Sequence, residues 1–62
     1  MTNLRTIRKS AKIKQKVVAE MLGVTAATVR NWETGLTYPK ASHLVQLASL
    51  YNVTVDMLVK EA

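Results

Sequence analysis

The stretch GVTAATVRNWETG, from Gly23 to Gly35, predicts a tight turn followed by a short helix. Gly23 suits the left-handed backbone conformation that ends a preceding helix, and Thr25 is a favourable N-cap for the next one. Val24 stands just before the cap, where it can pack on Val29 four residues into the helix. The stretch therefore predicts two helices that meet at a tight turn.

The helix that Thr25 begins has one core face and one free face. At 100° per residue, Val29 and Trp32 point the same way. This phase assigns Trp32 to the core; the alternative, stacking on an unpaired base, is how aromatic side chains act in proteins that bind single strands. The opposite face is left free for a partner and holds Ala27, Arg30, Asn31 and Thr34.

Helical patterns also extend outward from this stretch in both directions. Apolar residues at helical spacing predict helices over about 3–11, 15–22 and 41–51, and Thr54 caps a last short helix. Gly35 and Asn52 are suited to end the two helices that precede them, and Pro39 keeps Tyr38 out of helical geometry. We therefore expect an all-α, compact five-helix domain that occupies residues 1–62 as one unit.

The composition excludes several classes of protein. The chain has 62 residues and no cysteine, which removes disulfides, zinc sites built on thiolates and cysteine nucleophiles. One histidine, four carboxylates without close pairing and no glycine-rich phosphate loop give no catalytic or metal-binding constellation. The sequence predicts a protein that is not an enzyme and needs no cofactor.

The positive charge gathers in the first half of the chain. The net charge is +5, and residues 1–31 hold seven of the nine Lys and Arg residues but one of the four acidic residues. This asymmetry favours an anionic partner, although lysines also simply solvate helix surfaces. A basic amphipathic helix at 3–11 is compatible with a membrane surface, but it has no aromatic anchor. The sequence MTNLRTIRKS is not a signal peptide, so we expect a soluble cytoplasmic protein.

The segment QKVVAEMLGVTAATVRNWETG, residues 15–35, resembles the Cro/repressor, or XRE-type, helix-turn-helix family, which includes lambdoid-phage repressors and Cro proteins. The resemblance covers about residues 4–59 and implies a lambda-repressor-like fold with the helix-turn-helix proper at about 15–34. The positions that match the family pattern are Gln15, Ala19, Leu22, Gly23, Val24, Val29, Glu33, Gly35, Pro39, Leu47, Ala48, Val53, Asp56 and Leu58.

The resemblance implies that helix 25–34 enters the major groove of double-stranded DNA and reads bases through Ala26, Ala27, Arg30 and Asn31. An alanine methyl can pack on the methyl group of thymine, and the Asn31 amide can be bidentate to adenine. Arg30 can be bidentate to guanine or can hold a phosphate. Many relatives have glutamine, serine or arginine in place of the two alanines. We therefore expect recognition by this chain to depend more on thymine methyl groups and on DNA shape than recognition by those relatives does.

Other positions resemble the family's contacts to the DNA backbone and its structural ion pair. Gln15 resembles a phosphate-contacting glutamine at the start of helix 15–22. Arg8 and Glu33 match a pair that forms a salt bridge in the family, for which we expect a structural role. We predict Glu33→Ala to lower stability and to weaken DNA binding only secondarily. Further candidates for phosphate contact are Lys14, Lys16, Thr25, Thr28, Thr37, Tyr38 and Lys40.

Apolar residues at positions that relatives often make polar suggest protein contacts. Val17 and Met21 lie four apart on the outward face of helix 15–22, and Leu50, Met57 and Val59 could form a weak or DNA-induced homodimer. The leading hypothesis is a Cro-like repressor that occupies an operator on the nucleoid. The alternative is an antirepressor-like or antitoxin-like module that grips a regulatory protein through these apolar residues. His43 is expected to be exposed, since it has no second His or Cys with which to bind a metal.

Overall fold

The computed structural model describes residues 3–60, and within them the chain forms five helices and no strand. The helices are α1 (Leu4–Ser10), α2 (Gln15–Leu22), α3 (Ala26–Thr34), α4 (Ala41–Tyr51) and α5 (Val55–Val59). The predicted all-α class is confirmed, and the predicted helix over 3–11 is one residue shorter at each end. None of these helices has the length and apolar character needed to cross a membrane.

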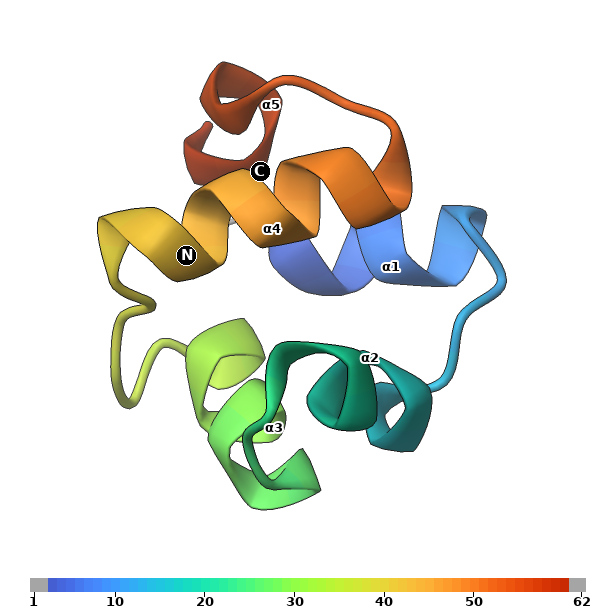
Figure 1. Ribbon diagram of the computed structural model, residues 1–62. Helices are drawn as coiled ribbons and strands as arrows, with labels where there is room; N and C mark the ends of the chain where they lie inside the picture. The colour runs from blue at the N-terminus through green and yellow to red at the C-terminus, as the bar shows by residue number, and fades with distance from the viewer. Residues whose placement is uncertain (1–2, 61–62) are drawn as a thin grey trace.

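The helices form two groups, which are joined by α1 and by contacts between α2 and α4. Figure 1 shows α2 and α3 together at one end of the molecule, with α4 and α5 at the other. The α1 helix contacts both α3 and α5. A backbone hydrogen bond of 3.2 Å from Asn3 N to Leu58 O also ties the start of α1 to α5. The α2–α3 unit therefore lies at one end of the molecule, where α1 packs against α3 and α4 packs against α2.

The core draws one fully buried side chain from each of the last four helices: Val18, Val29, Leu47 and Leu58. Trp32 is only 4% exposed, which confirms its place in the core. Burying an aliphatic side chain of this size contributes about 1.5–3 kcal/mol. The core consequently fixes the outward rotation of α3, because Val29 and Trp32 both face inward.

Three helices end at a residue with a left-handed backbone, and a fourth such residue follows shortly after α1. Gly23 (φ 71°), Gly35 (φ 85°) and Asn52 (φ 58°) take this conformation as predicted. Lys12 (φ 60°) does so as well, which the sequence did not predict. A Cβ makes this conformation costly for a lysine, so other contacts must hold it there. Two hydrogen bonds between Arg8 and Ile13 span this position. The Arg8 guanidinium donates to the Ile13 carbonyl at 2.9 Å, and the Ile13 N–H donates to the Arg8 carbonyl at 3.4 Å.

The predicted caps at the helix starts are present. The Thr25 hydroxyl accepts from Thr28 N at 3.1 Å, and the Thr54 hydroxyl accepts from Met57 N at 3.2 Å. No side chain caps α2, which begins after Lys14. Pro39 is buried in the connection between α3 and α4. The start of α3 is thus fixed locally, by one side chain, before any tertiary contact is counted.

Candidate nucleic-acid interface

The outward face of α3 carries the side chains predicted to read bases. Ala26, Ala27 and Arg30 are exposed, and Asn31 is half-buried. Within residues 3–60, the Asn31 amide makes no hydrogen bond, whereas the Asn31 carbonyl accepts from Leu36 N at 3.0 Å. The first turn of α3 therefore presents two methyl groups beside an amide whose donors and acceptor are free for a ligand.

The hydroxyls at the start of α3 keep one free donor. Thr25 Oγ1 and Thr28 Oγ1 lie 2.9 Å apart, and one of them donates to the other. The other hydroxyl hydrogen then has no acceptor within residues 3–60. Thr25 is exposed and Thr28 is half-buried. This pair can thus cap the helix and still donate one hydrogen bond to a phosphate at its N-terminus.

A buried network joins the three helices around this face. Arg8 Nε donates to Glu33 Oε2 at 2.6 Å, and a second guanidinium nitrogen donates to Glu33 Oε1 at 3.3 Å. The predicted ion pair of α1 and α3 is therefore present, and both residues are buried. Gln15 Nε2 donates to Glu33 Oε1 at 2.9 Å. For Gln15 the sequence predicted only a contact with the DNA backbone, whereas in the structure its side chain is held by a hydrogen bond to Glu33.

A polar recess of about 440 Å³ lies over this network. It brings Gln15, predicted to contact the DNA backbone, next to Arg30, predicted to read bases. It also includes Arg5 of α1, for which the sequence predicted no functional role. The side chains that line the recess are Arg5, Arg8, Gln15, Arg30, Glu33 and Thr34.

The remaining candidates for DNA backbone contact are exposed and flank α3 on two sides. Lys14 and Lys16 surround Gln15 at the start of α2, while Thr37, Tyr38 and Lys40 belong to the connection after α3. Tyr38 is 61% exposed, as expected for an extended loop residue before Pro39. These positions place donors on either side of the helix that is expected to enter the groove.

A core tyrosine lies close enough to the ion pair to be affected by its charges. Burial, assisted by the negative charge of Glu33 and opposed by the positive charge of Arg8, raises the pKa of Tyr51 from 10.0 to about 12. The raised pKa means that the folded protein holds the phenol proton more tightly than the unfolded chain does. Stability from this group is therefore complete below pH 10 and is lost as the pH rises towards 12.

We expect the free energy of unfolding to fall less steeply in Tyr51→Phe than in the wild type between about pH 10 and 12. The difference over this interval should be on the order of 2 kcal/mol, since each pKa unit corresponds to about 1.4 kcal/mol. Urea unfolding followed by circular dichroism measures it. Tyr38→Phe removes an exposed phenol and should behave as the wild type. Parallel curves for Tyr51→Phe and the wild type would contradict the prediction.

His43 was predicted to be exposed, and this prediction is wrong. His43 is half-buried, and its ring centroid lies 5.0 Å from that of Trp32 at a tilt of 39°. Its Nδ1 atom is buried and has no hydrogen-bond partner within the described part of the chain. The prediction failed because the start of α4 brings the His43 ring against Trp32 of α3, a contact between residues eleven apart that helical phase alone does not show.

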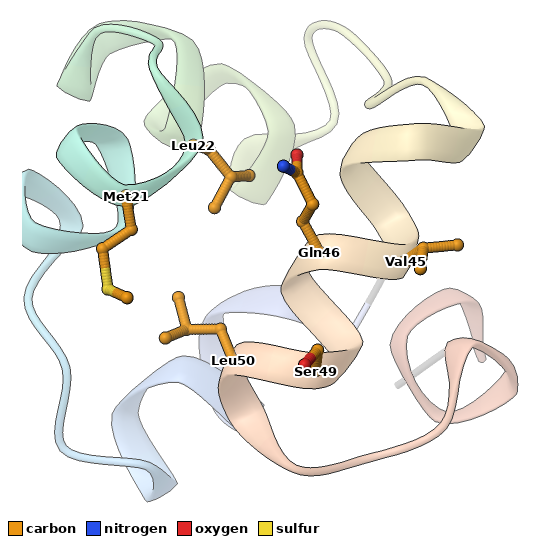
Figure 2. A pocket seen from close by; sticks show the side chains of 6 residues that line it. All are labelled: Met21, Leu22, Val45, Gln46, Ser49 and Leu50. Atoms are coloured by element: carbon orange, nitrogen blue, oxygen red, sulfur yellow. The ribbon is translucent and has the colours of Figure 1, made fainter.

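The predicted apolar contact residues fall into two places. Val17 and Met21 are exposed on α2, at 44% and 62%. Leu50 is half-buried and lines an apolar groove of about 410 Å³ between α2 and α4. Figure 2 shows Met21 and Leu50 pointing toward each other across this groove, while Val45 points away. Met57 and Val59 lie on α5 and do not line the groove.

Two exposed apolar residues were missed by the sequence analysis. Leu36 is 74% exposed and Val45 is 61% exposed. Val45 could have been identified from its phase, because Leu44, Leu47 and Tyr51 set the inward face of α4 and Val45 lies outside it.

Among residues 3–60, no group of three His, Asp or Glu side chains could hold a metal ion.

Comparison with known proteins identifies the family. A helix-turn-helix family model matches residues 4–58. Repressor protein C2 of Salmonella phage P22 is 32% identical over 57 residues, which cover 92% of this chain and 26% of the repressor. The HTH-type transcriptional regulator YqaE of Bacillus subtilis is 31% identical over 58 residues, covering 94% of this chain and 50% of that protein.

A third relative is named an activator. The HTH-type transcriptional activator BcrR of Enterococcus faecalis is 30% identical over 56 residues, covering 90% of this chain and 28% of BcrR. The chain thus spans between about a quarter and a half of the length of these relatives. Their names favour a DNA-binding regulator over a module that binds only protein. The chain therefore belongs to the helix-turn-helix family, whose model matches nearly the whole of it.

Proposed function

We propose that the domain binds a double-stranded DNA operator with α3 in the major groove and regulates transcription in the cytoplasm as a Cro-like repressor. The observation that carries the proposal is the free face of α3, which combines small methyl groups with an unengaged amide. The major groove is about 12 Å wide and admits a helix. Occupancy of the operator would exclude polymerase without any cofactor.

Ala26, Ala27 and Asn31 are the proposed base-reading residues. The two alanines allow α3 to approach the base edges closely and pack on thymine methyl groups, while Asn31 pairs with adenine. Gln15, Lys14 and Lys16 then hold phosphates at the start of α2, and Thr37, Tyr38 and Lys40 do so beyond α3. One bidentate base contact is worth about 1–3 kcal/mol of discrimination, so a single domain selects its site weakly.

Pairing of two domains on DNA would supply the missing selectivity. Met57 is 47% exposed on α5, and Val59 lies two residues further along the same short helix. Contact between two such helices would set half-sites about 34 Å apart on one side of the duplex. Leu50 belongs to the groove with Met21, so we base the proposed contact on Met57 and Val59. Any such dimer is weak in solution and is reinforced by DNA.

The test is fluorescence anisotropy with a labelled duplex from upstream of the protein's own gene and a scrambled duplex as competitor. We expect the wild type to prefer the upstream duplex and Asn31→Ala to lose about 1–3 kcal/mol of that preference. Gln46→Ala removes an exposed amide from α4 and serves as the matched control, which should bind as the wild type does. Equal binding to both duplexes by the wild type would contradict the proposal.

A further inference from the structure

We propose that the recess between α1, the start of α2 and α3 binds one backbone phosphate of the DNA, held between Arg5 and Arg30. On this assignment Arg30 anchors the domain on the duplex and does not read a base. The assignment rests on the DNA binding proposed above and adds two residues to it. Arg5 gains a role, and Arg30 moves from the base-reading set to the phosphate-binding set.

The charge of the recess favours an anion. Three of its six lining side chains are guanidinium groups, and one is a carboxylate. That carboxylate, Glu33, already accepts hydrogen bonds from Arg8 and Gln15. The charges of Arg5 and Arg30 are not compensated by any ion pair within residues 3–60. The recess therefore carries a net positive charge that a phosphate would neutralise.

The hydrogen-bonding groups around the recess match the oxygens of a phosphate. Each guanidinium presents a planar fork of N–H donors, a geometry suited to bidentate contact with phosphate. Thr34 lies four residues after Arg30 on the same face of α3 and adds a hydroxyl. Gln15 keeps one amide N–H beyond the one that it donates to Glu33. Donors from three helices thus converge on one recess.

The phase of α3 places Arg30 in a different row of the helix from Ala27 and Asn31. Ala27 and Asn31 lie four residues apart and form one row, while Ala26, Arg30 and Thr34 form the neighbouring row, of which only Arg30 and Thr34 line the recess. These two residues line it with Arg5 of α1, whereas neither Ala27 nor Asn31 does so. Arg30 lies on the side of α3 that borders α1. When α3 enters the groove, the Arg30 side chain would therefore face the DNA backbone at the edge of the groove and not the base edges.

The first experiment compares Arg5→Gln, Arg30→Gln and the double variant with the wild type on the upstream duplex, across a series of salt concentrations. Each single variant should bind about tenfold more weakly at low salt, as expected for loss of a charge-assisted hydrogen bond. The salt dependence of binding should fall by about 0.9 in log–log slope for Arg30→Gln. Because both arginines hold the same phosphate, the double variant should lose less than the product of the two single losses.

Two controls separate this effect from a general change of charge or stability. Lys9→Gln removes one positive charge from the exposed side of α1, outside the recess, and should lose little affinity. Arg5 and Arg30 repel each other in the free protein, so neither substitution should lower the melting temperature. A lowered melting temperature together with unchanged DNA affinity would show a structural role and overturn the assignment.

The second experiment distinguishes phosphate anchoring from base reading. Selection from a pool of randomised duplexes should give Arg30→Gln the same preferred sequence as the wild type, whereas Asn31→Ala should change it. An altered sequence for Arg30→Gln with an unchanged salt slope would make Arg30 a base reader and overturn the assignment. Wild-type affinity in both arginine variants would also overturn it, while leaving the proposed DNA binding intact. Failure of the wild type to bind any duplex would overturn both.

A third measurement identifies the source of the phosphate. The Nε–H signals of Arg5 and Arg30 in a nitrogen-15 NMR spectrum should shift on addition of the duplex. Inorganic phosphate should shift them only at far higher concentration, because it lacks the neighbouring contacts of the DNA. A response to inorganic phosphate at the concentration at which the duplex saturates would make the recess a small-anion site and overturn its assignment to DNA.

Discussion

Glu33→Ala is expected to lower the free energy of unfolding by about 3–5 kcal/mol, the range found when one partner of a buried ion pair is removed. Arg8 would stay buried with its charge uncompensated, and only the Ile13 carbonyl would still accept from it. Folded proteins have about 5–15 kcal/mol of stability in total, so this loss would be a large fraction of the stability of the domain. Thermal and urea unfolding measure this effect.

The matched variant removes both charges together. Arg8→Met combined with Glu33→Leu fills a similar volume with apolar groups and should recover most of the lost stability, since no buried charge remains without a partner. Glu33→Gln keeps the size of the side chain and should fall between the wild type and Glu33→Ala. An unchanged melting temperature in Glu33→Ala would contradict a structural role for the pair.

The structure alters the expected effect of Glu33→Ala on DNA binding. From the sequence, we predicted only a secondary loss that follows from lower stability. Glu33 also accepts the hydrogen bond that orients the Gln15 amide at the start of α2. We therefore expect the folded fraction of the variant to bind DNA more weakly than the wild type. Measurement at low temperature, where most of the variant is folded, separates this effect from unfolding.

Ala27→Glu is expected to lower DNA affinity by more than a factor of about 100, with no loss of stability. Its carboxylate would face the bases and phosphates of the groove, where juxtaposed like charges cost several kcal/mol. In the free protein Ala27 is exposed, and a glutamate in the first turn of α3 is favoured by the helix dipole. Anisotropy and thermal unfolding of the same sample measure both effects.

Two further variants test whether the position or the charge is responsible. Ser49→Glu introduces the same charge on the exposed side of α4 and should retain most of the affinity. Ala27→Gln introduces a neutral side chain of similar size and should change the preferred DNA sequence while retaining binding. Equal losses in Ala27→Glu and Ser49→Glu would show a general effect of charge and contradict the placement of α3 in the groove.

The sequence by itself determined the helices and most of their ends. Apolar spacing gave the bounds of α1, α2 and α4 to within about one residue because the inward face of each helix repeats every three or four residues. Thr25 and Thr54 cap α3 and α5 as predicted, because capping involves only residues three apart. Gly23, Gly35 and Asn52 took the left-handed conformation for an equally local reason, the low cost of positive φ in these residue types.

The tertiary structure decided the contacts between residues that are distant in the sequence. It tied Gln15 to Glu33, eighteen residues away, and placed Arg5 beside Arg30 in one recess. It also laid His43 on Trp32 and brought Leu50 opposite Met21. Lys12 took a left-handed conformation because Arg8 and Ile13 bond to each other across it. Helical periodicity gives the direction of a side chain from its own axis, but only the packing of the helices sets which side chains meet.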